Sequence, residues 1–128
     1  MDNEIIITSS AKIWLDKDEI IRAEIKNGAK LTLEDAIENI KIFEKIGKEP
    51  RLLLADIRNI KSATKEIKGY FSSEEVSKII PVRAILVGSP VAKVMGNVLF
   101  KVVKHLFVVK IFTSETEAIE WLKSFMVK

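Results

Sequence analysis

The stretch Arg51–Thr64, with the sequence RLLLADIRNIKSAT, decides how this chain folds. The run Leu52–Ala55 is apolar and strand-like, and it ends in an acid, Asp56. A short polar loop follows, with hydroxyl side chains at Ser62 and Thr64, where the next helix is expected to begin. This order is typical of α/β domains, because the loops at the carboxyl ends of parallel strands form an exposed edge.

Length and composition narrow the class of protein. A chain of 128 residues fits one domain, 1–128. Hydrophobic residues make up 48% of the chain and charged residues 30%, which allows both a core and a charged surface. The net charge of +3 is a mild excess of lysine, and no Lys/Arg cluster alternates with aromatic residues. We therefore expect no nucleic-acid partner.

The absence of cysteine excludes disulfides, thiolate metal sites and a cysteine nucleophile. The start Met1–Glu4 is acidic rather than basic, unlike a signal peptide, and no run approaches the roughly 20 apolar residues that span a bilayer. These features indicate a soluble cytoplasmic protein.

Outward from the opening stretch, apolar patterns predict the other elements. Three short strand-like runs, Glu4–Thr8, Lys12–Leu15 and Glu19–Lys26, predict an antiparallel hairpin at the edge of a sheet. Strands and helices then alternate. The predicted helices begin at Thr32, Thr64, Val91 and Ser114, and the predicted strands are Arg51–Asp56, Val82–Val87 and Phe107–Phe112. The second helix, Thr64–Ile79, is expected to restart at Ser72–Glu75.

This order predicts an α/β fold with a mainly parallel sheet of about four strands in sequential order, the edge hairpin and four helices. Right-handed crossovers that step in one direction place their helices on one face of the sheet. The strands Leu52–Ala55 and Ala84–Val87 are nevertheless apolar on both faces. An extra element or a second subunit must cover the other face, and a homodimer is our preferred hypothesis.

Candidate functional residues gather where the parallel strands end. They are Asp56, Arg58, Ser62 and Thr64 in one loop, and Gly88 and Ser89 in the next. Amide groups at the following helix starts favour an anion, whereas Asp56 repels one unless Arg58 pairs with it. Helix capping is the first interpretation of the hydroxyl groups, and a phosphorylation or docking loop is the alternative.

The predicted third helix, Val91–Lys104, carries a basic face formed by Lys93, Lys101 and Lys104 beside a wide apolar arc. A helix of this kind can lie on an anionic membrane, although a buried helix with a solvated lysine face is the preferred interpretation.

The single histidine, His105, follows the third helix and is interpreted as a surface or capping residue. No phosphate-binding, dinucleotide-binding or hydrolase motif occurs. We expect no enzymatic activity, no metal and no cofactor.

Several segments resemble a known family. They are Ala55–Arg58, Thr64–Glu66, Ser89–Pro90, Gly96–Asn97, Lys110–Thr113 and Glu117–Leu122. On these segments and its strand–helix order, most of the chain resembles the STAS domain of anti-sigma-factor antagonists and the related CRAL-TRIO-like lipid-binding fold. It is most similar to a bacterial group of small uncharacterised STAS-like proteins.

In antagonists of that family, a serine or threonine after the central strand is phosphorylated by a partner kinase. Ser62 is the nearest match in position and Thr64 the next, although the family's Asp-Ser-Ser-Gly-Leu-like motif is absent from this sequence. A phosphate there would gain from the helix amides and from Lys61 and Lys65.

Two functional hypotheses follow. The first is a non-enzymatic regulatory or protein-interaction module, with a protein partner bound by the loop Asp56–Thr64, the second helix and the start of the third. The alternative is a small-ligand or lipid-binding protein, in which the third helix forms a pocket wall or a membrane face.

Overall fold

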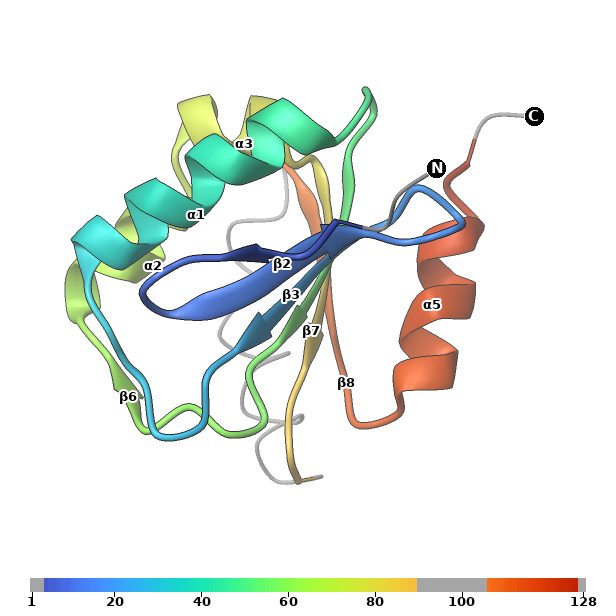
Figure 1. Cartoon of the computed structure of the whole chain (residues 1–128). Helices are drawn as coiled ribbons and strands as arrows, with labels where there is room; N and C mark the ends of the chain where they lie inside the picture. Colours follow the sequence, from blue (N-terminus) through green and yellow to red (C-terminus); the bar gives the residue numbers. More distant parts are fainter. Residues whose placement is uncertain (1–3, 90–105, 127–128) are drawn as a thin grey trace.

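The computed structural model describes residues 4–89 and 106–126, which include a six-stranded sheet in the order β1-β2-β3-β5-β7-β8 (Figure 1). The strands of this sheet are β1 Ile6–Ile7, β2 Ala11–Leu15, β3 Ile21–Ile25, β5 Leu52–Asp56, β7 Val82–Leu86 and β8 Val108–Phe112. The described helices are α1 Leu33–Ile46, α2 Lys65–Phe71, α3 Glu74–Ile79 and α5 Glu115–Lys123. The third predicted helix, Val91–Lys104, lies outside the described residues.

The sheet has the predicted architecture. β1, β2 and β3 pair antiparallel as an edge hairpin, and β3, β5, β7 and β8 then pair parallel in sequential order. The α/β fold class, with its mostly parallel sheet and its N-terminal hairpin, is therefore confirmed.

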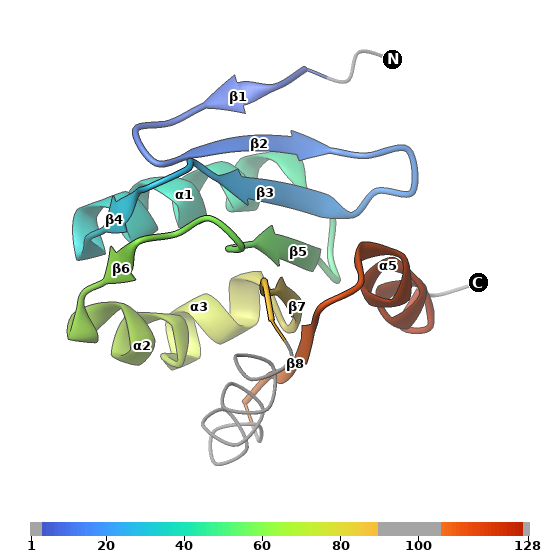
Figure 2. The same ribbon diagram turned by 90° about the horizontal axis from the view of Figure 1, so that it is seen from below.

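One face of the sheet packs against α1, α2 and α3, which lie together on that side (Figure 2). The buried apolar residues of this layer are Ala11, Ile13, Ile21, Ala23, Ile25 and Leu53 from the sheet, Leu31 before α1, and Ala36, Ile40, Phe43, Ile67, Val76 and Ile80 from the helical side. α1 begins at Thr32, as predicted, with a reciprocal capping box between Thr32 and Asp35, and Gly47 ends the helix.

The opposite face is covered by α5, which packs against β5, β7 and β8 (Figure 1). The buried residues of this second layer are Ile20, Leu52, Leu54, Val82, Ala84, Leu86 and Phe112, together with Ala118 and Leu122 of α5. The crossover helices that the structure describes, α1, α2 and α3, lie on one face as predicted, whereas α5 follows the last strand and is not a crossover. The sequence left two possibilities for what covers this face, an extra element or a second subunit. In the structure an extra element, α5, covers these strands.

The predicted second helix is divided into α2 and α3. The break falls at Ser72–Ser73, and the Ser73 hydroxyl accepts a hydrogen bond from the backbone N–H of Val76, 3.2 Å away. The predicted restart is therefore confirmed, with Ser73 as the capping residue.

A buried arginine joins both helix ends to the sheet. Arg83 of β7 donates from Nε to the carbonyl of Ile80 at 2.9 Å and from Nη1 to the carbonyl of Phe71 at 2.5 Å. Its guanidinium carbon lies 3.8 Å from the ring centre of Phe107. Burial lowers the pKa of Arg83 to about 10.

A second, two-stranded parallel sheet was not predicted from the sequence. β4 (Lys30–Leu31) pairs with β6 (Ser62–Ala63), with Lys30 opposite Ser62. This pairing holds the loop after β5 against the segment that precedes α1. Among the described residues, no helix has both the length and the apolar character needed to cross a bilayer.

Candidate functional site

The loop after β5 begins with an ion pair between two predicted residues. Arg58 donates from Nη2 to Asp56 Oδ2 at 2.7 Å and from Nε to Oδ1 at 3.0 Å, and its backbone N–H also reaches Oδ1 at 3.1 Å. Burial of the Asp56 carboxyl raises its pKa, but the hydrogen bonds and charge of Arg58 outweigh this effect and hold the pKa below its ordinary value. Arg58 therefore pairs with Asp56, which is the condition under which this acid would not repel an anion.

This pair belongs to a larger group of charges that we call the ion cluster: Asp16, Arg22, Asp56, Arg58 and Glu115. Arg22 donates from Nη1 to Asp16 Oδ2 at 3.3 Å and from Nη2 to Glu115 Oε2. Arg58 Nη2 lies 4.0 Å from the other Glu115 oxygen. The cluster therefore connects the β2–β3 turn, the loop after β5 and the start of α5.

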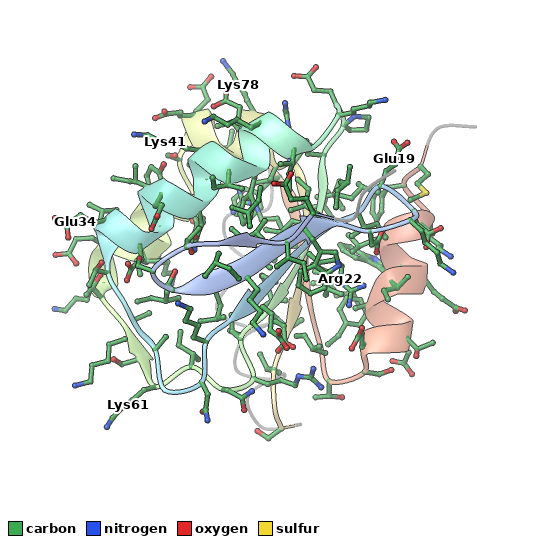
Figure 3. All side chains as sticks on the ribbon, in the orientation of Figure 1. Glu19, Arg22, Glu34, Lys41, Lys61 and Lys78 are labelled. Atoms are coloured by element: carbon green, nitrogen blue, oxygen red, sulfur yellow. The ribbon has the colours of Figure 1, made fainter. Side chains whose placement is uncertain are left out.

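Figure 3 shows Arg22 between the sheet and α5. Its side chain and that of Trp14 line two hollows. The first, with a volume of about 240 Å³, is lined by Trp14, Arg22, Ala23, Glu24, Leu54, Asp56, Arg58, Leu86 and Glu115. The second, of about 390 Å³, is lined by Ile5, Trp14, Asp16, Lys17, Asp18, Arg22 and Ile119. The first hollow is smaller than the 300–1,000 Å³ typical of small-molecule sites, so we do not assign it a ligand.

Three members of the ion cluster were not predicted from the sequence. Asp16, Arg22 and Glu115 were not candidates, and Arg22 and Glu115 are 93 positions apart. One signal was present: Trp14 and Arg22 lie directly opposite each other on β2 and β3. The alternation of the hairpin therefore places them on one face, where the Arg22 guanidinium carbon lies 5.5 Å from the Trp14 ring centre.

The predicted hydroxyl residues lie on a separate surface. Ser62 is in β6, and Thr64 is at the N-cap position of α2, but the Thr64 side chain makes no capping hydrogen bond. Neither hydroxyl bonds to any of the described residues, and residues 61–66 are all exposed. We call residues 61–66 the β6 surface. Thr64 therefore occupies the predicted N-cap position without capping the helix through its side chain, and Ser62, as a residue of β6, is not a cap.

The loop after β7 lies against the loop after β5. The backbone N–H of Ile57 donates to the carbonyl of Leu86 at 3.0 Å, and a methyl group built on Gly88 would lie 3.7 Å from the carbonyl oxygen of Arg58. Gly88 is thus close to the Asp56–Arg58 pair, and Ser89 follows in a bend. The predicted anion-binding helix start cannot be placed further, because residues 90–105 lie outside the described residues.

The same limit applies to the predicted basic face. Lys93, Lys101, Lys104 and His105 all lie outside the described residues. Within residues 4–89 and 106–126, no group of three or more His, Asp or Glu side chains could hold a metal ion. The lipid-binding hypothesis, which rests on those lysines, stays a prediction.

Comparisons with known proteins agree with the fold. No curated protein matches the chain. A crystal structure of an uncharacterised protein of the DUF3478 family from Shewanella loihica PV-4, described as having a SpoIIAA-like fold, superposes with a TM-score of 0.64. The alignment covers 95% of this chain and 98% of that chain at 19% sequence identity, so the likeness shows a shared fold. The SpoIIAA-like fold is the STAS-like fold that the sequence resembles.

A family model for a domain of unknown function matches residues 13–126, and the chain therefore belongs to the DUF7793 family.

Proposed function

We propose that this protein is a non-enzymatic regulatory module that binds a protein partner through the β6 surface. The observation that carries the proposal is an unbroken exposed run, Lys61–Glu66, with two hydroxyl groups that bond to none of the described residues. Its position after the central strand β5 corresponds to the switch segment of the STAS domains that the chain resembles.

The backbone of the β6 surface is held in place although its side chains are exposed. The N–H of Lys61 donates to the carbonyl of Ala29 at 2.9 Å, and the N–H of Thr64 donates to the carbonyl of Leu31 at 3.1 Å. An anchored backbone loses less conformational freedom when a partner binds. This preorganisation supports binding as the role of the surface.

The ion cluster supports a non-enzymatic role. A general acid or base works best when its pKa is near the working pH. Arg58 instead keeps Asp56 ionised, and the other two acids of the cluster, Asp16 and Glu115, both pair with Arg22. These carboxylates tie the sheet to α5, so we assign them a structural role.

Phosphorylation of Ser62 is the proposed switch. A phosphate adds about −1.5 to −2 charge to a surface where Lys61 and Lys65 flank the hydroxyls in sequence. The modification would change the sign of the local charge and, with it, the affinity for a partner.

Site-specific photo-crosslinking tests the binding proposal. A photoreactive residue replaces Thr64 in one sample and Lys41, an exposed residue of α1, in a matched control. In an extract of the native host, we expect a discrete adduct with one protein from position 64 and not from position 41. No adduct, or the same adducts from both positions, contradicts the proposal.

The purified partner then tests the switch. Ser62→Asp is expected to change the dissociation constant by about tenfold, the scale of one or two charge-assisted contacts. Ser62→Ala and Ser124→Asp, the latter at the end of α5, serve as controls and should leave the dissociation constant unchanged. Equal affinity of Ser62→Asp and the parent contradicts the switch and leaves the binding result standing.

A further inference from the structure

β1 forms one edge of the six-stranded sheet, and among the described strands it pairs only with β2. Ile7 of β1 and Ile5, which directly precedes the strand, are the most exposed large apolar residues in the described part of the chain, at 59% and 54%. Natural edge strands are usually protected by short length, lysine, proline or a bulge; β1 is short, with two residues, but Ile5–Ile7 has no lysine or proline. An apolar edge of this kind is suited to pairing with another strand.

The hydrogen-bond pattern shows which backbone groups of this edge are turned outward. Thr8 donates its N–H to the carbonyl of Ala11 at 2.9 Å, and Ile6 lies opposite Ile13. Because hydrogen-bonded pairs alternate along an antiparallel ladder, Thr8 and Ile6 use their backbone groups toward β2. The N–H and C=O groups of Ile5 and Ile7 therefore point away from the sheet.

This spacing is self-complementary. If a second copy pairs antiparallel with Ile6 on the two-fold axis, Ile5 of each copy lies opposite Ile7 of the other. The outward groups of both residues then bond in two hydrogen-bonded pairs, and the two Ile6 residues face each other as a non-bonded pair. No charged side chain faces another one, since Glu4 lies opposite Thr8.

The side chains fit the same arrangement. Ile7 lies opposite Lys12 on β2, so Ile5 and Ile7 are on the same sheet face as Trp14. In the paired state, four isoleucines meet between the two Trp14 side chains, and the apolar wall formed by Ile5 and Trp14 becomes continuous across the axis. Isologous contacts of this type close as two-fold dimers.

We propose that β1 is a homodimer interface, in which the β1 edges of two copies join their sheets into one continuous sheet. The occupant of this edge is thus a second copy of the same chain. The inference is independent of the β6 surface, which lies at a different place in the fold (Figure 2).

Sedimentation of the full chain tests the association. The mass is expected to rise with concentration from 14.5 kDa toward twice that value. Ile5→Lys/Ile7→Lys places like charges opposite each other in both pairs and should raise the dissociation constant about tenfold or more. The matched variant Ile5→Lys/Ile7→Glu places opposite charges together and should retain the dimer. Circular dichroism confirms that both variants are folded.

Cysteine substitution tests the register, because the natural chain has no cysteine. On oxidation, Ile6→Cys should form a disulfide-linked dimer, since Cα atoms of a non-bonded pair are about 4.5 Å apart. Ile5→Cys should not, because its two Cα atoms would be roughly 8 Å apart. Random collision predicts the reverse order, since Ile5 is more exposed than Ile6. A parent that stays monomeric at millimolar concentration, or crosslinking through position 5 rather than 6, overturns the proposal.

Discussion

Arg58 binds both carboxylate oxygens of Asp56, with Nη2 at 2.7 Å from Oδ2 and Nε at 3.0 Å from Oδ1. Two parallel charge-assisted hydrogen bonds of this kind give an arginine–carboxylate pair both strength and a defined orientation. The pair therefore determines the direction in which the chain leaves β5, and it places Arg58 within 4.0 Å of Glu115 on α5.

Asp56→Asn removes the negative charge while keeping the size of the side chain. We expect the free energy of unfolding at pH 7 to fall by about 1 kcal/mol, the scale of a partly exposed ion pair. The folded-state pKa of Asp56 is lowered, so its stabilisation is complete above the unfolded value near 3.8 and is lost as the pH falls through the folded pKa. Urea titrations should therefore show a smaller difference between parent and variant at about pH 2 than at pH 7. A difference that does not depend on pH would contradict this assignment.

The Arg22–Glu115 contact is expected to couple the hairpin to α5. A double-mutant cycle with Arg22→Gln and Glu115→Gln should give a coupling energy of about 0.5–1 kcal/mol, which decreases at high salt. The exposed pair Lys78–Glu74 on α3 is the matched control, with an expected value of about 0.3 kcal/mol. Equal coupling energies in the two cycles would show that the ion cluster adds nothing beyond a surface pair.

Arg83 is expected to stabilise the junction of α2, α3 and β7. Arg83→Ala leaves the carbonyls of Phe71 and Ile80 without their donor and opens a cavity beside Phe107, so it should lower the free energy of unfolding by about 3 kcal/mol. Arg83→Met keeps most of the volume and removes a buried charge, and it should cost about 1–2 kcal/mol less than the alanine variant. Chemical denaturation measures both values, and a methionine variant as unstable as the alanine variant would contradict the packing role.

Thr32 and Thr64 allow a matched test of capping. The Thr32 hydroxyl accepts from the backbone N–H of Asp35 at 3.2 Å, whereas Thr64 caps nothing with its side chain. Thr32→Ala should therefore lower the free energy of unfolding by about 1 kcal/mol, and Thr64→Ala should change it by less than about 0.3 kcal/mol. A comparable loss in both variants, measured by thermal or urea unfolding, would restore the capping interpretation of Thr64.

Local patterns were sufficient for most of the fold. The apolar run of β5 and its terminal Asp56, the cap at Thr32 and the interruption before Ser73 each act within a few residues, so each is visible in the sequence. The β4–β6 ladder escaped prediction because two-residue strands such as Ser62–Ala63 carry no periodic pattern. Ser62 therefore looked like part of the loop before the helix, where a hydroxyl is expected to cap.

The site was only partly predictable. Asp56 and Arg58 are two positions apart, and their pairing follows from that proximity. Their link to Glu115 and Arg22 joins residues from three distant segments, and no local spacing specifies it. The sequence places the candidate residues at the edge where the parallel strands end, but it does not divide them between the ion cluster and the β6 surface.

The order of the elements and the parallel pairing of the strands follow from the sequence alone, because hydrophobic periodicity and the right-handed crossover rule act locally and leave few arrangements. The position of α5 over the second face of the sheet is visible only in the folded molecule, since a helix after the last strand is not constrained by any crossover. The same holds for the charge pairing and the exposed edge of β1, because both depend on which distant segments meet in space.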